Sequence, residues 1–156
     1  IQKLCREYKV PFVINDNVEI AAEIEADGVH VGQSDMEAGD VRAKLGADKI
    51  IGVSAQTVEQ ALRAQEHGAD YLGVGAMYAT NTKTDARAVT KEQLVEIRAA
   101  VDIPIVIIGG VNQKTVPNFK GMGIDGAAVV SAVVSQSDIE KAAKDLRELC
   151  EDCFGR

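Results

Sequence analysis

Six short runs rich in β-branched residues alternate along the chain with segments of helical periodicity, and this alternation constrains the fold more than any other feature. The runs are PFVIN (11–15), GVHVG (28–32), KIIGVS (49–54), YLGVG (71–75), PIVIIGG (104–110) and GAAVVSA (126–132). Between them apolar residues recur every three or four positions, as in residues 57–68 and 90–101. Strands that alternate with helices predict a parallel sheet in an α/β fold.

A degenerate repeat stands directly before three of these runs. Its copies are Ala26-Asp27-Gly28, Gly68-Ala69-Asp70-Tyr71 and Gly123-Ile124-Asp125-Gly126. Gly68 and Gly123 are expected to end helices in the left-handed conformation, which glycine enters at little cost. The repeating unit is therefore helix, tight turn and strand. No Pro-rich or Ser-rich linker interrupts it, so we expect one domain over residues 1–156, closed by an amphipathic helix over 137–153.

Composition restricts the function classes. With 156 residues, 46% of them hydrophobic, the chain can fill one core, and it has no apolar run long enough to cross a membrane. A formal net charge of −7 argues against a nucleic-acid partner, which normally requires a basic stripe. The three cysteines, Cys5, Cys150 and Cys153, show no framework spacing, and no signal segment is recognised. We therefore expect a reduced, cytoplasmic protein.

Six such strands fit either an open doubly wound sheet or six units of a (β/α)₈ barrel. The stretch GVGAMY (73–78) lacks the third glycine of a dinucleotide fingerprint and opens no evident helix. Polar or glycine-rich residues follow every run, and in a barrel the chemistry lies on the loops after the carboxyl ends of the strands. The barrel is therefore favoured.

Two aspartates follow neighbouring strands of the predicted sheet. Asp16 and Asp35 are expected to approach one another and to share Mg²⁺, which prefers one or two carboxylates together with substrate phosphate oxygens. A structural interpretation is also open: residues 15–17 would cap a helix from Val18, and Asp35 would cap a helix that begins near Met36.

Two further segments suit phosphate groups. The loop 76–87 is rich in hydroxyls and places Lys83 between two threonines, which suits a diphosphate, although a solvated surface loop would look similar. Gly109-Gly110 would let the backbone approach a phosphate, or would only permit a tight turn. His30, inside a strand, and His67, at a helix end, are assigned structural roles.

Taken together, INDNVEIA, ADGVHVGQSDM, IGVSAQT, ADYLGVGAMYATNTKTDA, IPIVIIGGV and GAAVVSAV resemble the thiamine phosphate synthase family over essentially the whole chain. The resemblance implies a TIM (β/α)₈ barrel and a Mg²⁺-dependent transferase. It would join hydroxymethylpyrimidine diphosphate to thiazole phosphate, through a pyrimidine carbocation, and release pyrophosphate. No nucleophile or general base is then required, because a metal and a lysine stabilise the departing diphosphate.

The same resemblance assigns roles to residues of this sequence. It implies Asp16 and Asp35 as Mg²⁺ ligands, and Lys83 and Ser54 as the catalytic residues. The implied substrate contacts are Asn15 and Lys83 for the diphosphate, Ser54 for the pyrimidine, Thr80 and Thr82 for the thiazole-phosphate loop, and Gly110, Val130 and Ser131 for the backbone cradle of that phosphate.

The chain also departs from the family pattern. Ala79 replaces a usual proline and Gln56 a frequent histidine. The chain begins in what resembles the second helix of the family barrel, so we expect about six βα units, strands 3–8, without the family's Gln-x-Arg-x-Lys segment. A fragment of a longer protein or a homo-oligomer that shares surfaces would account for this. A thiazole tautomerase-like relative or a non-catalytic thiazole-phosphate-binding module are the alternative functions.

Overall fold

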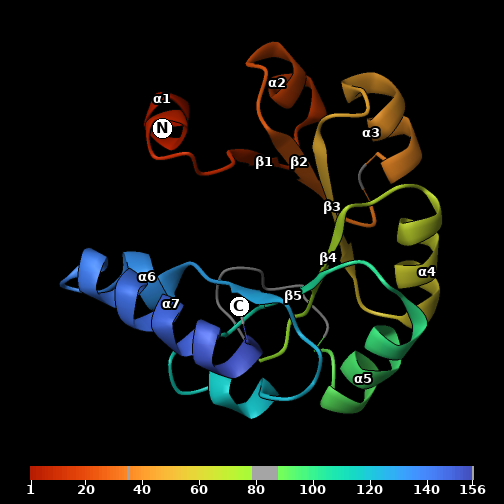
Figure 1. Ribbon diagram of the computed structural model, residues 1–156. Coiled ribbons are helices and arrows are strands. Elements are labelled where there is room, and N and C mark those ends of the chain that lie inside the picture. Colours follow the sequence, from red (N-terminus) through yellow and green to blue (C-terminus); the bar gives the residue numbers. More distant parts are fainter. Residues whose placement is uncertain (35, 79–87, 156) are drawn as a thin grey trace.

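The strands form one parallel sheet in the order in which they occur along the chain (Figure 1). The computed structural model describes residues 1–34, 36–78 and 88–155. Within these ranges the sheet has six strands, β1 (Val13–Asn15), β2 (Gly28–Val31), β3 (Ile50–Ala55), β4 (Tyr71–Val74), β5 (Ile105–Ile108) and β6 (Gly126–Ala128). A doubly wound sheet would reverse its strand order at a switch point. The consecutive order therefore excludes that alternative for the described sheet.

The helices lie along one side of the curved sheet (Figure 1). Helices α2 (Val18–Glu23), α3 (Ala38–Leu45), α4 (Val58–Glu66) and α5 (Lys91–Ala100) follow one another along its outer side, and α1 (Gln2–Glu7) lies at the β1 end. The other end of the row carries a 3₁₀ helix, η1 (Val116–Phe119), α6 (Ser131–Val134) and α7 (Ile139–Phe154). No helix within the described ranges is long and apolar enough to cross a membrane.

The two faces of the sheet differ in chemistry. Alternate residues of the central strands β2 to β5, such as Val29, Ile51 and Leu72, are fully buried in the core together with apolar residues of the helices. The opposite face carries small and polar residues on β2, β3 and β4, where the strand register aligns His30, Gly52 and Tyr71, and it carries Val106 and Ile108 on β5. His30 and Tyr71 are half-buried, so this second face, which we call the open face, is not closed by apolar packing.

The aspartate repeat seen in the sequence joins neighbouring strands at their amino-terminal ends. In each copy the carboxylate accepts a hydrogen bond from a backbone amide at the start of the preceding strand, and the aspartate amide donates to the carbonyl of that same residue. The carboxylate bonds are Phe12 to Asp27 at 2.7 Å, Ile51 to Asp70 at 2.7 Å and Ile105 to Asp125 at 2.8 Å. These paired bonds fix the register of β1 with β2, β3 with β4 and β5 with β6.

The structure corrects two predicted boundaries. The strand expected over 126–132 ends at Ala128, and Ser131 already belongs to α6, because Val130 leaves the extended conformation at ψ −80° despite its β-branched side chain. Helix α3 begins at Ala38 with Glu37 as its N-cap, two residues later than the start expected near Met36, and Asp35 itself lies outside the described residues.

Two other predictions can be compared with the structure. Gly68 follows the C-cap of α4 at φ 84°, as expected, whereas Gly123 has a positive φ of 71° but lies four residues beyond the 3₁₀ helix and does not end it. The closing helix forms one residue longer than expected at its carboxyl end, and the Asp138 side chain caps it by accepting from the Lys141 amide.

Candidate active site

Two residues after the carboxyl end of β1 have different roles: Asn17 caps a helix, and Asp16 has an exposed carboxylate. Asn17 Oδ1 accepts a hydrogen bond from the Ile20 amide at 2.9 Å and caps α2. Asp16 lies in the left-handed region at φ 66°, with its amide bonded to the His30 carbonyl. The Asn15 side-chain amide donates to Asp16 Oδ2 at 2.7 Å. The capping interpretation therefore holds for Asn17, whereas Asp16 keeps an exposed carboxylate on a backbone that costs free energy, as residues at functional sites often do.

Ser54, near the carboxyl end of β3, belongs to a row of polar side chains on the open face. Its Oγ lies 3.0 Å from His30 Nε2, and His30 Nδ1 lies 3.0 Å from the Tyr71 hydroxyl. The row thus crosses β2, β3 and β4. The Gln33 side-chain amide donates to the Ser54 carbonyl at 2.6 Å, which holds the backbone at this strand end.

Glycines make room for this row. A Cβ at Gly52 would overlap the Tyr71 ring and the Nδ1 atom of His30, and one at Gly73 would lie 2.9 Å from His30 Cε1. Burial raises the pKa of Tyr71, so the phenol remains neutral over the physiological range. The sequence interpretation gave His30 only a structural role and did not consider Tyr71. The available signal was a glycine inside each of two consecutive apolar runs, Gly52 and Gly73, because a glycine within a strand leaves space for a large side chain from a neighbouring strand.

The ends of β5 and β6 bring together the residues expected to cradle a phosphate. Ile108 is paired with Ala128, so Gly110 and Val130 each lie two residues beyond a paired position at the same edge of the sheet. Gly110 has φ of 67°, and its carbonyl accepts from the side chains of Asn112 at 3.2 Å and Thr115 at 3.4 Å. Val130 is exposed, and Ser131 begins α6.

The remaining predicted site residues, Asp35, Thr80, Thr82 and Lys83, lie outside the described residues. Among the residues that are described, no group of three or more His, Cys, Asp or Glu side chains could hold a metal. Gln56, which departs from the family pattern, donates its side-chain amide to the Gly75 carbonyl at 3.2 Å.

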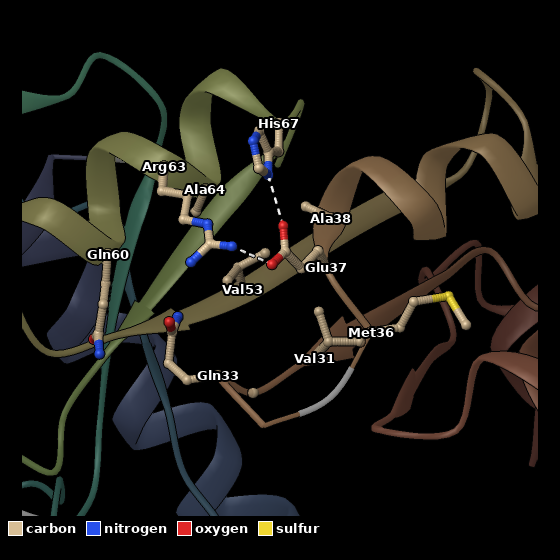
Figure 2. A pocket seen from close by; sticks show the side chains of 11 residues that line it. Val31, Gln33, Met36, Glu37, Ala38, Val53, Gln60, Arg63, Ala64 and His67 are labelled. Atoms are coloured by element: carbon tan, nitrogen blue, oxygen red, sulfur yellow. Dashed lines mark hydrogen bonds and ion pairs between the residues drawn. The ribbon is translucent and has the colours of Figure 1, made fainter.

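Two surface hollows lie away from the row on the open face. The first, of about 40 Å³, lies between α3 and α4 and contains the Glu37 carboxylate, which pairs with Arg63 and lies 3.3 Å from His67 Nδ1 (Figure 2). Its size suits a few water molecules rather than a substrate. The second, of about 360 Å³, lies at the amino-terminal end of the sheet and is lined by Cys5, Arg6, Lys9, Val10, Pro11, Asp27, Asp48, Lys49 and Ile50. Neither hollow includes Asn15, Asp16 or Ser54.

Comparison with known proteins places the chain in a family. Residues 1–133 match the family model described as thiamine monophosphate synthase. The chain belongs to this family. It is 50% identical over 148 residues to the thiamine-phosphate synthase of Clostridium botulinum (strain Eklund 17B / Type B), covering 95% of this chain and 70% of that protein. It is 52% identical over 147 residues to that of Clostridium beijerinckii, covering 94% and 70%.

A solved structure supports the same assignment. Thiamine phosphate pyrophosphorylase from Pyrococcus furiosus superposes with a TM-score of 0.89 at 39% identity and covers 99% of this chain and 74% of its own. The resemblance inferred from the sequence motifs is therefore confirmed, and with it the thiamine-phosphate synthase function and the transferase class that it implied.

Proposed function

We propose that this chain joins hydroxymethylpyrimidine diphosphate to thiazole phosphate, giving thiamine phosphate and pyrophosphate, at the carboxyl edge of the sheet. The identity of about 50% to thiamine-phosphate synthases, over about 70% of their length, carries the proposal. The geometry supports its location, because Asn15, Asp16 and Ser54 lie at or beside strand ends, where parallel α/β folds place their chemistry.

We further propose that the six βα units correspond to consecutive units of a (β/α)₈ barrel, with the open face as its inner face. The six described strands are parallel and in sequential order, and helices α2 to α5 lie along the outer side of the sheet (Figure 1). Small residues on the other face, such as Gly52 and Gly73, suit an interior in which side chains from neighbouring strands share limited space.

The Asp16 carboxylate fits a hard cation. It is exposed at the end of β1, and the hydrogen bond from Asn15 orients one of its two oxygens. We propose that Asp16 and Asp35 hold Mg²⁺, which prefers such oxygen ligands and supplies stabilisation of negative charge on a departing diphosphate.

The other residues bind and orient the two substrates in this proposal. Asn15 and Lys83 contact the diphosphate, and Lys83 stabilises the charge that develops on it as it leaves. Ser54 lies beside the pyrimidine. Thr80 and Thr82 belong to the thiazole-phosphate loop, and backbone groups of Gly110, Val130 and Ser131 surround that phosphate. No residue of this set has to abstract a proton before the diphosphate departs.

Pyrophosphate release, followed with both substrates and Mg²⁺, tests the proposed reaction. Lys83→Ala should weaken binding of the pyrimidine diphosphate by about 1.5–3 kcal/mol, the scale of a hydrogen bond to a charged group, with a smaller effect on thiazole phosphate. Lys114→Ala provides a matched control, since Lys114 is an exposed lysine in the turn after β5. Binding of thiazole phosphate without any turnover would overturn the synthase proposal and favour the non-catalytic module.

We also propose a homo-oligomer in a reducing, cytoplasmic environment. Large apolar side chains on α6 and α7 are exposed, including Val134 and Ile139, and a second copy would cover them. Cys5, Cys150 and Cys153, all within the described residues, are free thiols. Light scattering at several protein concentrations measures the assembly, and a monomer at every concentration would contradict it.

A further inference from the structure

When the His30 imidazole is neutral, the hydrogen bonds that join Tyr71, His30 and Ser54 can be arranged in two ways. In one, the Tyr71 hydroxyl donates to His30 Nδ1, and Nε2–H donates to Ser54 Oγ. In the other, Nδ1–H donates to Tyr71, and the Ser54 hydroxyl donates to Nε2. Both satisfy the two 3.0 Å contacts, because a neutral imidazole has one donor and one acceptor nitrogen. The two arrangements give Ser54 opposite properties toward a ligand.

The chemistry of the phenol favours the first arrangement. A phenol hydroxyl is a better donor than acceptor, and an imidazole nitrogen without hydrogen is a strong acceptor. Tyr71 is half-buried, and burial raises its pKa, so its hydrogen is present to be donated. With Nδ1 accepting, the ring hydrogen lies on Nε2 and points to Ser54 Oγ. The Ser54 hydroxyl hydrogen is then left to point elsewhere.

We propose that Tyr71, acting through the tautomer of His30, makes Ser54 a hydrogen-bond donor toward the ligand on the open face. Tyr71 and His30 are positioning residues, since they act through Ser54. The inference rests on the proposed function, in which Ser54 lies beside the pyrimidine. A pyrimidine ring nitrogen has a lone pair that can accept a hydrogen bond from the Ser54 hydroxyl. If that hydroxyl donates its hydrogen to His30 instead, it cannot donate to the pyrimidine.

The surrounding backbone fixes the row in place. Gly52 and Gly73 leave the space that the two rings occupy, and the ring centroids lie 5.4 Å apart at an interplanar angle of 40°. Gln33 holds the Ser54 carbonyl from the other side. The Ser54 oxygen is therefore positioned before a ligand binds, which lowers the cost of ordering this side chain during binding.

Nitrogen NMR of ¹⁵N-histidine-labelled protein reads the tautomer directly, at a pH where imidazole is neutral. The chain has two histidines, so His67→Asn identifies the His30 signals. We expect Nδ1 to resonate as the nitrogen without hydrogen and Nε2 as the protonated one. Tyr71→Phe should shift both signals toward a mixture of tautomers, while Tyr8→Phe, an exposed tyrosine on α1's C-cap, should shift neither. A hydrogen on Nδ1 in the unaltered protein, or identical spectra in Tyr71→Phe, would overturn the proposal.

Calorimetric titration with the pyrimidine diphosphate tests the consequence for binding. Ser54→Ala and Tyr71→Phe should each weaken binding about two- to tenfold, the range for one neutral hydrogen bond. The double variant should bind no more weakly than Ser54→Ala, because both changes remove the same bond. Additive losses of binding free energy would overturn the proposal that Tyr71 acts through His30 and Ser54, but they would leave the proposed function unaffected. Unchanged binding in Ser54→Ala would overturn the contact with the pyrimidine, even with the expected tautomer.

Discussion

The two edges of the sheet use aspartate in opposite ways. At the amino-terminal edge, Asp27, Asp70 and Asp125 accept from backbone amides of the preceding strand and so join strands in pairs. At the carboxyl-terminal edge, the Asp16 carboxylate is exposed and its backbone is in a left-handed conformation. At the amino-terminal edge the carboxylates stabilise the fold, whereas at the carboxyl-terminal edge the Asp16 carboxylate is available to a ligand. This division agrees with barrels in general, where one end serves stability and the other chemistry.

The largest expected effect is at the carboxyl edge. Asp16→Gly should lower kcat/KM by about 100- to 1,000-fold, the scale for losing one preorganised electrostatic contact. The same change should raise the free energy of unfolding by about 1 kcal/mol, because glycine adopts the φ of 66° without strain. Steady-state kinetics and urea unfolding measure the two effects.

Lys9→Gly is the backbone control for that experiment. Lys9 also has a positive φ, 55°, but lies in the loop between α1 and β1. It should gain similar stability and keep full activity. A loss of stability in Asp16→Gly would show that the carboxylate contributes to folding, and the contrast between the edges would fail.

The glycines beneath the polar row come next. Gly52→Ala should lower the free energy of unfolding by about 1–3 kcal/mol, as overpacking does, and should displace the His30 ring. Gly126→Ala is the matched control, because its Cβ would lie 3.5 Å from Val106 Cγ1, an ordinary contact on the same face of the sheet. Thermal unfolding of both variants would settle the comparison, and equal losses would show that the row is not tightly packed.

At the amino-terminal edge, Asp125→Ala should cost about 1–3 kcal/mol of stability, because it leaves the buried Ile105 amide without its carboxylate acceptor. Asp125→Asn keeps an acceptor oxygen and should cost less. Both variants should retain the kcat/KM of the unaltered protein. A selective loss of turnover in Asp125→Ala at full stability would contradict the structural role of this edge.

The smallest effect is expected away from both edges. Thr90 caps α5 and forms a capping box with Gln93. Thr90→Ala should cost about 1 kcal/mol of stability without changing turnover, which provides a baseline for a purely local loss. Urea unfolding measures this loss of stability. If Thr90→Ala lowers the free energy of unfolding as much as Asp125→Ala does, then the Asp125 hydrogen bond stabilises the protein no more than a helix cap.

Local patterns predicted most of the fold. The six strands are marked by runs of β-branched residues and the closing helix by its apolar periodicity, so these elements were found within a few residues of their places. The strand expected at 126–132 was too long because Val129 and Val130 suit a strand by composition, while their surroundings turn the chain into α6. Boundaries of this kind depend on tertiary contacts that propensity does not contain.

The sequence by itself determined the parallel α/β sheet and the family, because these follow from order and spacing along the chain. It also led to the proposal that the site lies at the strand ends. It also revealed the aspartate repeat but not its partners. Only the tertiary structure showed that His30 contacts Ser54, 24 residues away, and Tyr71, 41 residues away. Such contacts depend on the register of three strands and on the space left by glycines between them. A one-residue slip in register would move every side chain of a strand to the other face.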